Sequence, residues 1–246
     1  MLKHLSPLRL ILLLLFCPAI SFAQLGQPRS AISLGVNAGF AMNKMSFDPS
    51  IKQNWHFGPT LGVTARFTSE MYFKTLCALQ VELNYMQAGW RENVLSSAGV
   101  ELPDTYRRDM HYLQLPMLAR LAWGNETTGK GGRPGLMGFI VAGPQIGFLI
   151  GEKEHYGQTW TTLDDGTPDR PGGRYAQYGM KADKKFEYGI AAGGGLELHT
   201  RSGDFLLEGR YYYGLSDVFK NGKTDVFARS ASGTIVVKMT YLFSLR

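Results

Sequence analysis

The sequence predicts an all-β protein, an eight-stranded antiparallel up-and-down transmembrane β-barrel. After Gln24, apolar and polar residues alternate in eight stretches, and no long amphipathic helical period stands out. The clearest apolar faces run for about ten residues, the length that a tilted membrane strand needs. Longer and shorter connections alternate between the stretches, as in barrels that cross a membrane. We place the strands at 31–42, 56–68, 74–90, 106–123, 135–151, 186–199, 204–215 and 233–244.

The segment 1–23 is expected to be a cleaved signal peptide, which leaves 24–246 as the barrel domain. A positively charged start and an apolar run from Leu10 to Phe16 precede Ser21-Phe22-Ala23, which supplies small residues at −3 and −1. An uncleaved membrane anchor is the alternative, but the apolar run is short for a helical span of about 20 residues. We therefore expect export and location in the outer membrane.

Charge and cysteine content narrow the class of protein further. The chain carries 26 Lys+Arg against 20 Asp+Glu, and the cations are spread through turns and strands rather than clustered. This pattern argues against a nucleic-acid-binding surface. Only Cys77 remains after cleavage, so the mature chain has no internal disulfide.

The first three strands are marked by alternation and by aromatic residues at their ends. The stretch 31–42 alternates along its length, and 56–68 begins beside Trp55, where a membrane-interface aromatic is expected. The stretch 74–90 is the clearest of the three. Its apolar face carries Leu79, Val81, Leu83 and Tyr85, and its polar face Gln80, Glu82 and Asn84.

The fourth and fifth strands differ in polarity. In 106–123, the apolar face carries Leu113, Leu115, Met117, Ala119, Leu121 and Trp123, opposite Tyr112, Gln114, Pro116, Leu118 and Arg120. The segment 135–151 is the one stretch that could be a helical span. Internal glycines, Pro144 and Gln145 interrupt it, so one long strand or a buried strand pair is the better interpretation.

The last three strands complete the pattern. In 186–199, Gly189, Gly193 and Gly195 share the face opposite the apolar one, where they would leave room for long side chains of neighbouring strands. The final two strands again oppose apolar and polar faces. Phe205, Leu207, Tyr211 and Tyr213 oppose Glu208, Arg210 and Tyr212, and Ile235, Val237, Met239, Tyr241 and Phe243 oppose Thr234, Lys238 and Thr240.

Charged residues lie on the face of the strands opposite the apolar one. They are Glu82, Arg120, Glu187, Glu197, Glu208, Arg210 and Lys238. A soluble sandwich would turn them to water, whereas a small membrane barrel would turn them into its lumen, where opposite charges can pair. We expect a structural lumen cluster of Glu82, Arg120, Glu197, Glu208 and Arg210.

Four local patterns resemble the PorT-like outer membrane protein β-barrel family, of the small OmpA and OmpX type. They are Ser33-Leu34-Gly35-Val36-Asn37-Ala38-Gly39, Glu82-Leu83-Asn84-Tyr85, Tyr112-Leu113-Gln114-Leu115-Pro116-Met117-Leu118, and Glu208-Gly209-Arg210-Tyr211 with Gly214-Leu215, which is followed by Tyr241-Leu242-Phe243 in the closing strand. The resemblance implies an outer-membrane barrel in contact with lipid, recognised by the barrel-assembly machinery through Tyr241 and Phe243. Some relatives are associated with secretion, which implies envelope or secretion proteins as partners.

No motif in the chain predicts a catalytic, cofactor or metal site. The run Gly124–Gly131 matches the start of a phosphate-binding loop but lacks the final Ser/Thr and a following helix. His155 shares its loop with several carboxylates, but they lack the ligand spacing of a calcium loop.

We therefore expect a non-enzymatic barrel that acts in envelope structure, adhesion or secretion through its outer loops. One alternative is a rim enzyme, a lipid acyltransferase or a protease, with His56 and His155 as the candidate residues near the outer rim. Another is a soluble, secreted, lipocalin-like carrier.

Overall fold

A computed structural model describes residues 27–72, 75–95, 101–125, 134–157, 160–162, 164, 168–169, 178–222 and 225–245. The expected signal peptide and most of the Gly124–Gly131 run lie outside these residues. No helix in the described part of the chain has the length and apolar character of a membrane span.

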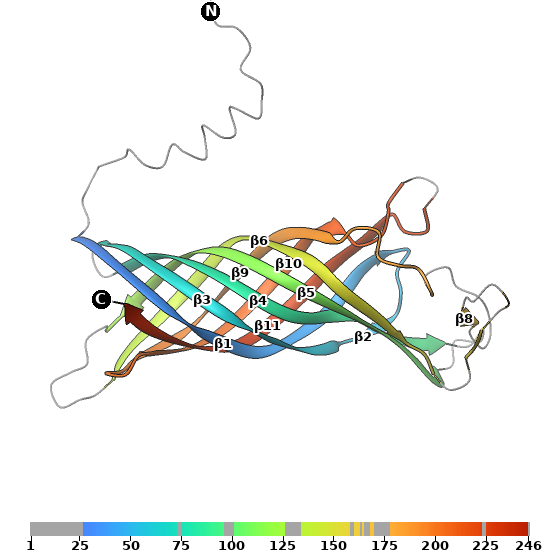
Figure 1. The fold of residues 1–246 in the computed structure, drawn as a ribbon, viewed down its shortest axis with the longest axis horizontal. Helices are drawn as coiled ribbons and strands as arrows, with labels where there is room; N and C mark the ends of the chain where they lie inside the picture. The colour runs from blue at the N-terminus through green and yellow to red at the C-terminus, as the bar shows by residue number, and fades with distance from the viewer. Residues whose placement is uncertain are drawn as a thin grey trace, which may run out of the picture.

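Eight long strands form the body of the molecule (Figure 1). They are β1 (Gln27–Asp48), β3 (His56–Tyr72), β4 (Thr75–Leu95), β5 (Glu101–Gly124), β6 (Gly135–His155), β9 (Phe186–His199), β10 (Asp204–Asp217) and β11 (Arg229–Leu245). In the described parts of the connections there are three two-residue strands. They are β2 (Gln53–Asn54), β7 (Thr161–Thr162) and β8 (Pro168–Asp169).

The eight long strands close into a ring. Each pairs antiparallel with the next long strand in the chain, and β1 pairs with β11 from Ile32↔Leu245 to Asp48↔Arg229. Closure leaves no unpaired edge among these strands, as a sheet surrounded by lipid requires. The predicted eight-stranded antiparallel barrel is confirmed.

The two ends of the barrel differ. The C-terminus and the start of β1 lie at the end with the connections after β3, β5 and β9 (Figure 1). The connection 156–185, the longest between long strands, lies at the opposite end, which we call the outer end. In barrels with an even strand number, the termini and short turns face the periplasm.

Several strands extend further toward the outer end than the sequence predicted. β5 begins at Glu101 rather than at 106, and β11 at Arg229 rather than at 233. In the β11 extension, Arg229 is partly buried and Ala231 is buried, so the exposed apolar face formed by Val237 and Met239 does not continue into it. Backbone pairing therefore continues where the apolar alternation has already ended.

The burial pattern is the reverse of that of a soluble protein. On the outer wall, Phe40, Phe57 and Met239 are 70%, 65% and 63% exposed, whereas charged side chains on the inner face are buried. Large apolar side chains cover the wall over many strands, far more than an ordinary soluble surface carries. This wall is suited to lipid, and a soluble carrier would not present it to water.

Candidate functional site

Two charge clusters lie on the inner face of the barrel, beside a cluster of buried apolar side chains. The first joins Glu82 of β4, Glu208 and Arg210 of β10, and Lys238 of β11, all at most 5% exposed. Arg210 Nη2 lies 2.8 Å from Glu82 Oε1, and Arg210 Nε donates to Glu208 Oε1 at 2.7 Å. Lys238 Nζ donates to the same Glu82 oxygen. Two carboxylates and two cations make this first quartet electrically neutral.

The second quartet lies closer to the end of the barrel that carries the C-terminus. Arg66 of β3 bridges two carboxylates, with Nη1 2.5 Å from Glu197 Oε1 and Nη2 2.6 Å from Asp204 Oδ2. Arg120 of β5 donates to the other Glu197 oxygen and packs its guanidinium 3.7 Å from the ring centroid of Phe139. Two cations again meet two carboxylates, which is how buried charge is tolerated.

Gln80 connects the two quartets. Its Nε2 donates to Glu82 Oε1 at 2.6 Å and to Glu208 Oε2 at 3.2 Å. Its Oε1 accepts from Arg120 Nη1 at 3.5 Å. The inner charges of β4, β5 and β10 therefore belong to one hydrogen-bonded network that crosses the lumen.

All five residues of the expected lumen cluster lie on the inner face and take part in this network. Glu82, Glu208 and Arg210 meet in the first quartet, and Arg120 and Glu197 in the second. Sequence reasoning missed Arg66 and Asp204, and it put Lys238 on the inner face without including it in the cluster. Arg66 shares its strand face with Thr64 and Thr68, so the alternation of 56–68 could have revealed it. Asp204 is the first residue of its strand. At this position the sequence does not distinguish a residue of the turn from one whose side chain faces the lumen.

Glycines of β9 make room for the first quartet. Gly193 pairs with Arg210, and Gly195 pairs with Glu208. A Cβ on Gly193 would lie 2.7 Å from the Arg210 Cα, closer than side chains approach. This is the role that the sequence pattern predicted for these glycines.

Among the residues that the structure describes, one group has the spacing of a metal site. Glu197, His199 and Asp204 each place one ligand atom within 4.8 Å of the others. However, Arg66 bonds to both carboxylates, and His199 Nδ1 is 2.7 Å from Asp204 Oδ1. The guanidinium already occupies the oxygens that a cation would need and would repel a divalent ion.

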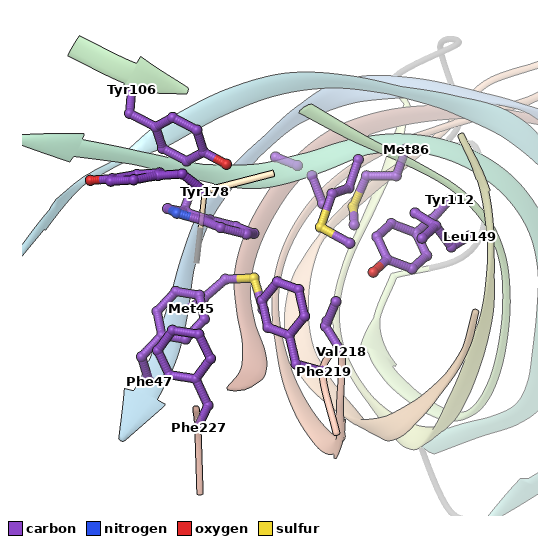
Figure 2. Packing of buried hydrophobic residues seen from close by; sticks show 14 residues of the cluster. Met45, Phe47, Met86, Tyr106, Tyr112, Leu149, Tyr178, Val218, Phe219 and Phe227 are labelled. Carbon is purple, nitrogen blue, oxygen red and sulfur yellow. The ribbon is translucent and has the colours of Figure 1, made fainter. Parts of the chain in front are cut away.

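An apolar and aromatic cap fills the outer end of the lumen (Figure 2). Phe47 packs against Phe219 and Phe227, with ring centroids 6.5 and 4.9 Å away. Tyr178 packs edge-on against Tyr106 at 4.7 Å. Tyr178, Val218, Phe219 and Phe227 come from connections rather than from long strands. The described parts of the connections 156–185 and 218–228 thus fold into the barrel mouth.

Buried charges anchor this cap. Arg108 lies 5.4 Å from the ring centroids of both Trp90 and Phe219, and its guanidinium pairs with Glu152 and Glu154. A second anchor is Glu92. It accepts from Trp90 Nε1 at 2.8 Å and from Tyr178 Oη at 2.6 Å, which ties strand β4 to the long connection. Beyond β6, burial and the Glu154 carboxylate raise the pKa of the Tyr156 phenol.

The two rim histidines of the enzyme alternative meet on one carboxylate. His56 Nε2 is 2.7 Å from Asp109 Oδ1, and His155 Nε2 is 3.1 Å from Asp109 Oδ2. His56 belongs to β3 and Asp109 to β5, with Gly89 of β4 in register opposite Asp109. The absence of a side chain at Gly89 lets the two groups meet across an intervening strand.

This histidine–carboxylate group lacks a nucleophile in the described part of the chain. No hydroxyl or thiol is hydrogen-bonded to His56 or His155 there, while Arg107 Nη2 also binds Asp109 at 3.1 Å. Nucleophilic catalysis needs a hydroxyl or thiol within hydrogen-bond reach of the base. Spacing alone could not reveal the group, since its members are about 50 positions apart in the chain.

Among solved structures, the chain is similar to several small outer-membrane proteins. Neisserial surface protein A (NspA) shows 12% identity and a TM-score of 0.36, over 86% of this chain and 97% of that one. Ail, the attachment invasion locus protein of Yersinia pestis, shows 13% identity and a TM-score of 0.32, over 86% and 98%. OprG from Pseudomonas aeruginosa shows 13% identity and a TM-score of 0.33, over 88% and 98%.

Sequence comparison gives the family. No curated protein matches the chain. The family model described as "Outer membrane protein beta-barrel domain" matches residues 22–220, most of the chain and seven of its eight long strands. The protein therefore belongs to the outer membrane protein β-barrel domain family.

Proposed function

We propose that this protein is a closed, non-conducting and non-enzymatic outer-membrane barrel that acts through its outer end, in envelope structure, adhesion or secretion. The filling of the lumen is the observation that carries this proposal. Eight strands enclose a space just wide enough for side chains. Two charge quartets occupy part of it, and the aromatic cap occupies the mouth. An ion or solute would have to break buried ion pairs to pass.

The proposal includes a route to the membrane. Segment 1–23 is removed as a signal peptide before Gln24, and the barrel-assembly machinery recognises the closing strand through Tyr241 and Phe243. Tyr241 Oη donates to the Ser202 carbonyl at 2.6 Å in the short β9–β10 turn, and Phe243 is 45% exposed on the outer wall. Both residues thus lie at the periplasmic end, where the assembly machinery would recognise a strand that enters from the periplasm.

The specific role is proposed from the resemblance to the PorT-like family. The four motifs that carry it favour an envelope or secretion protein as the partner, together with outer-membrane lipid. The described parts of the outer connections are folded against the cap, so they present a fixed surface to such a partner.

Planar-bilayer recording tests the closed lumen. Protein whose folding is verified by its mobility in an unheated gel should give no conductance steps. Replacing Arg66 and Arg120 together by alanine removes bulk and ion pairs from one layer only, and this variant should stay closed as well, because the first quartet and the aromatic cap still fill the lumen. Steady conductance from the wild-type barrel would refute the proposal.

The meeting of His56 and His155 on Asp109 is the observation that favours a rim enzyme, a lipid acyltransferase or a protease. That function requires His56→Ala or His155→Ala to abolish a lipid- or peptide-cleaving activity in a barrel that still folds. Lys220→Ala, in an exposed outer-end side chain, is the control. If the wild type shows no turnover of either substrate class, the non-enzymatic proposal is supported.

A further inference from the structure

A groove of about 250 Å³ lies on the outer wall near the outer end of β1, β10 and β11. Its floor is Gly233 of β11, which pairs with Lys44 of β1 on one side and with Tyr213 of β10 on the other. Glycine has no side chain, so the wall is hollow between these two neighbours. A Cβ on Gly233 would lie 3.3 Å from the Tyr211 hydroxyl.

Two cations and three aromatic rings line the groove. Lys44 Nζ lies 4.5 Å from the ring centroid of Trp55. On the other wall, the Arg229 guanidinium lies 5.5 Å from the ring centroid of Tyr213 and donates a hydrogen bond to its hydroxyl. The rings therefore hold both cations at the groove without neutralising them.

The positive charge of the groove is uncompensated. In the described part of the chain, neither Lys44 nor Arg229 forms an ion pair with a carboxylate, although Asp48 stands opposite Arg229 in the strand register. Arg229 Nε is buried and has no hydrogen-bond acceptor among the described residues. The site thus offers charge and one donor that an anionic ligand would satisfy.

The groove lies at the boundary of the lipid-facing wall. Below it on β11, Val237 and Met239 are 45% and 63% exposed, and on β1 Phe40 is 70% exposed. Because the opposite end of the barrel carries the C-terminus and the short turns, this boundary is at the headgroup level of the outer leaflet. Trp and Tyr are typical of that level.

We propose that this groove binds the phosphate-bearing headgroup of an outer-leaflet lipid, with its acyl chains along the apolar wall below. Arg229 and Lys44 pair with phosphate oxygens, and the rings of Trp55 and Tyr213 flank the headgroup. Charge, hollow and apolar wall coincide at one place, as a lipid requires and a soluble anion does not.

Native mass spectrometry of the folded protein tests this proposal, with diphosphorylated lipid A and its dephosphorylated form as probes. The wild type should retain the phosphorylated lipid. The double variant Lys44→Gln/Arg229→Gln should bind it about thirtyfold more weakly, since each basic residue near a membrane surface contributes about 1 kcal/mol and about 1.4 kcal/mol is tenfold in affinity. Gly233→Val should also weaken binding, because it fills the hollow and leaves both charges in place.

The matched control is Lys184→Gln/Lys220→Gln, which removes two outer-end charges outside this groove and should retain the lipid. Unchanged retention in both groove variants would overturn the proposal. So would equal affinity for the dephosphorylated lipid, or displacement by millimolar inorganic phosphate, which would indicate a site for soluble anions. The inference depends on membrane residence and not on the closed lumen, so conductance recordings do not affect it.

Discussion

The neutrality of the first quartet leads to a quantitative prediction for Glu82→Gln and Lys238→Met. Glu82 accepts hydrogen bonds from Arg210, Lys238, Gln80 and Asn84, and it is 1% exposed. Removing its charge leaves two buried cations against Glu208 alone. Breaking a buried ion pair from one side costs about 3–5 kcal/mol of unfolding free energy. Lys238→Met leaves the opposite imbalance, and we expect a cost of the same size.

The double variant restores the balance, because Glu208 and Arg210 then form a neutral pair. Its loss of unfolding free energy should stay close to that of one single variant. This corresponds to a coupling energy of about 3 kcal/mol between Glu82 and Lys238. Urea unfolding of the barrel in lipid vesicles measures all three free energies, and Lys220→Met at an exposed site should change them by less than about 0.5 kcal/mol. Strict additivity of the two single costs would refute the quartet as an energetic unit.

Two further predictions concern the same lumen. Gly193→Ala should lower the unfolding free energy by about 1–3 kcal/mol, whereas Gly209→Ala, where a Cβ meets nothing within 4 Å, should be nearly neutral in the same urea assay. The double reversal Arg120→Glu/Glu197→Arg should not recover wild-type stability, because Arg66 also binds Glu197 and would face a new cation. Recovery of the full wild-type stability would show that Arg120 and Glu197 pair independently of Arg66.

The strand pattern was predictable because lipid reverses the burial of a barrel without changing its period of two. Leu79, Leu83 and Leu121 are exposed while Glu82 and Arg120 are buried, so the outer face is apolar and the charges lie on the inner face. Beyond the lipid band the alternation of an apolar outer face with a polar inner face ends, because the inner face there carries apolar residues of the cap such as Phe47 and Trp90. The extensions of β5 and β11 therefore had no signal in the alternation.

The inner-face residues were predictable for the same reason, but their partners were not. Parity places Glu82 and Arg210 inside, yet which charges meet depends on strand register, and their separation in the chain is 128 positions. Strand register alone does not predict the contact between His56 and Asp109, because the two side chains meet across strand β4 at Gly89. The aromatic cap also escaped prediction, since Phe219 and Tyr178 lie in connections without a repeating pattern.

The central claim is that the eight strands close into one membrane barrel. Fractionation of the native protein, followed by gel electrophoresis with and without boiling, tests it most directly. We predict recovery in the outer-membrane fraction and a lower apparent mass in the unheated sample than in the boiled one, because the closed barrel stays compact until heated. Recovery in the soluble fraction with no change of mobility on boiling would contradict the account.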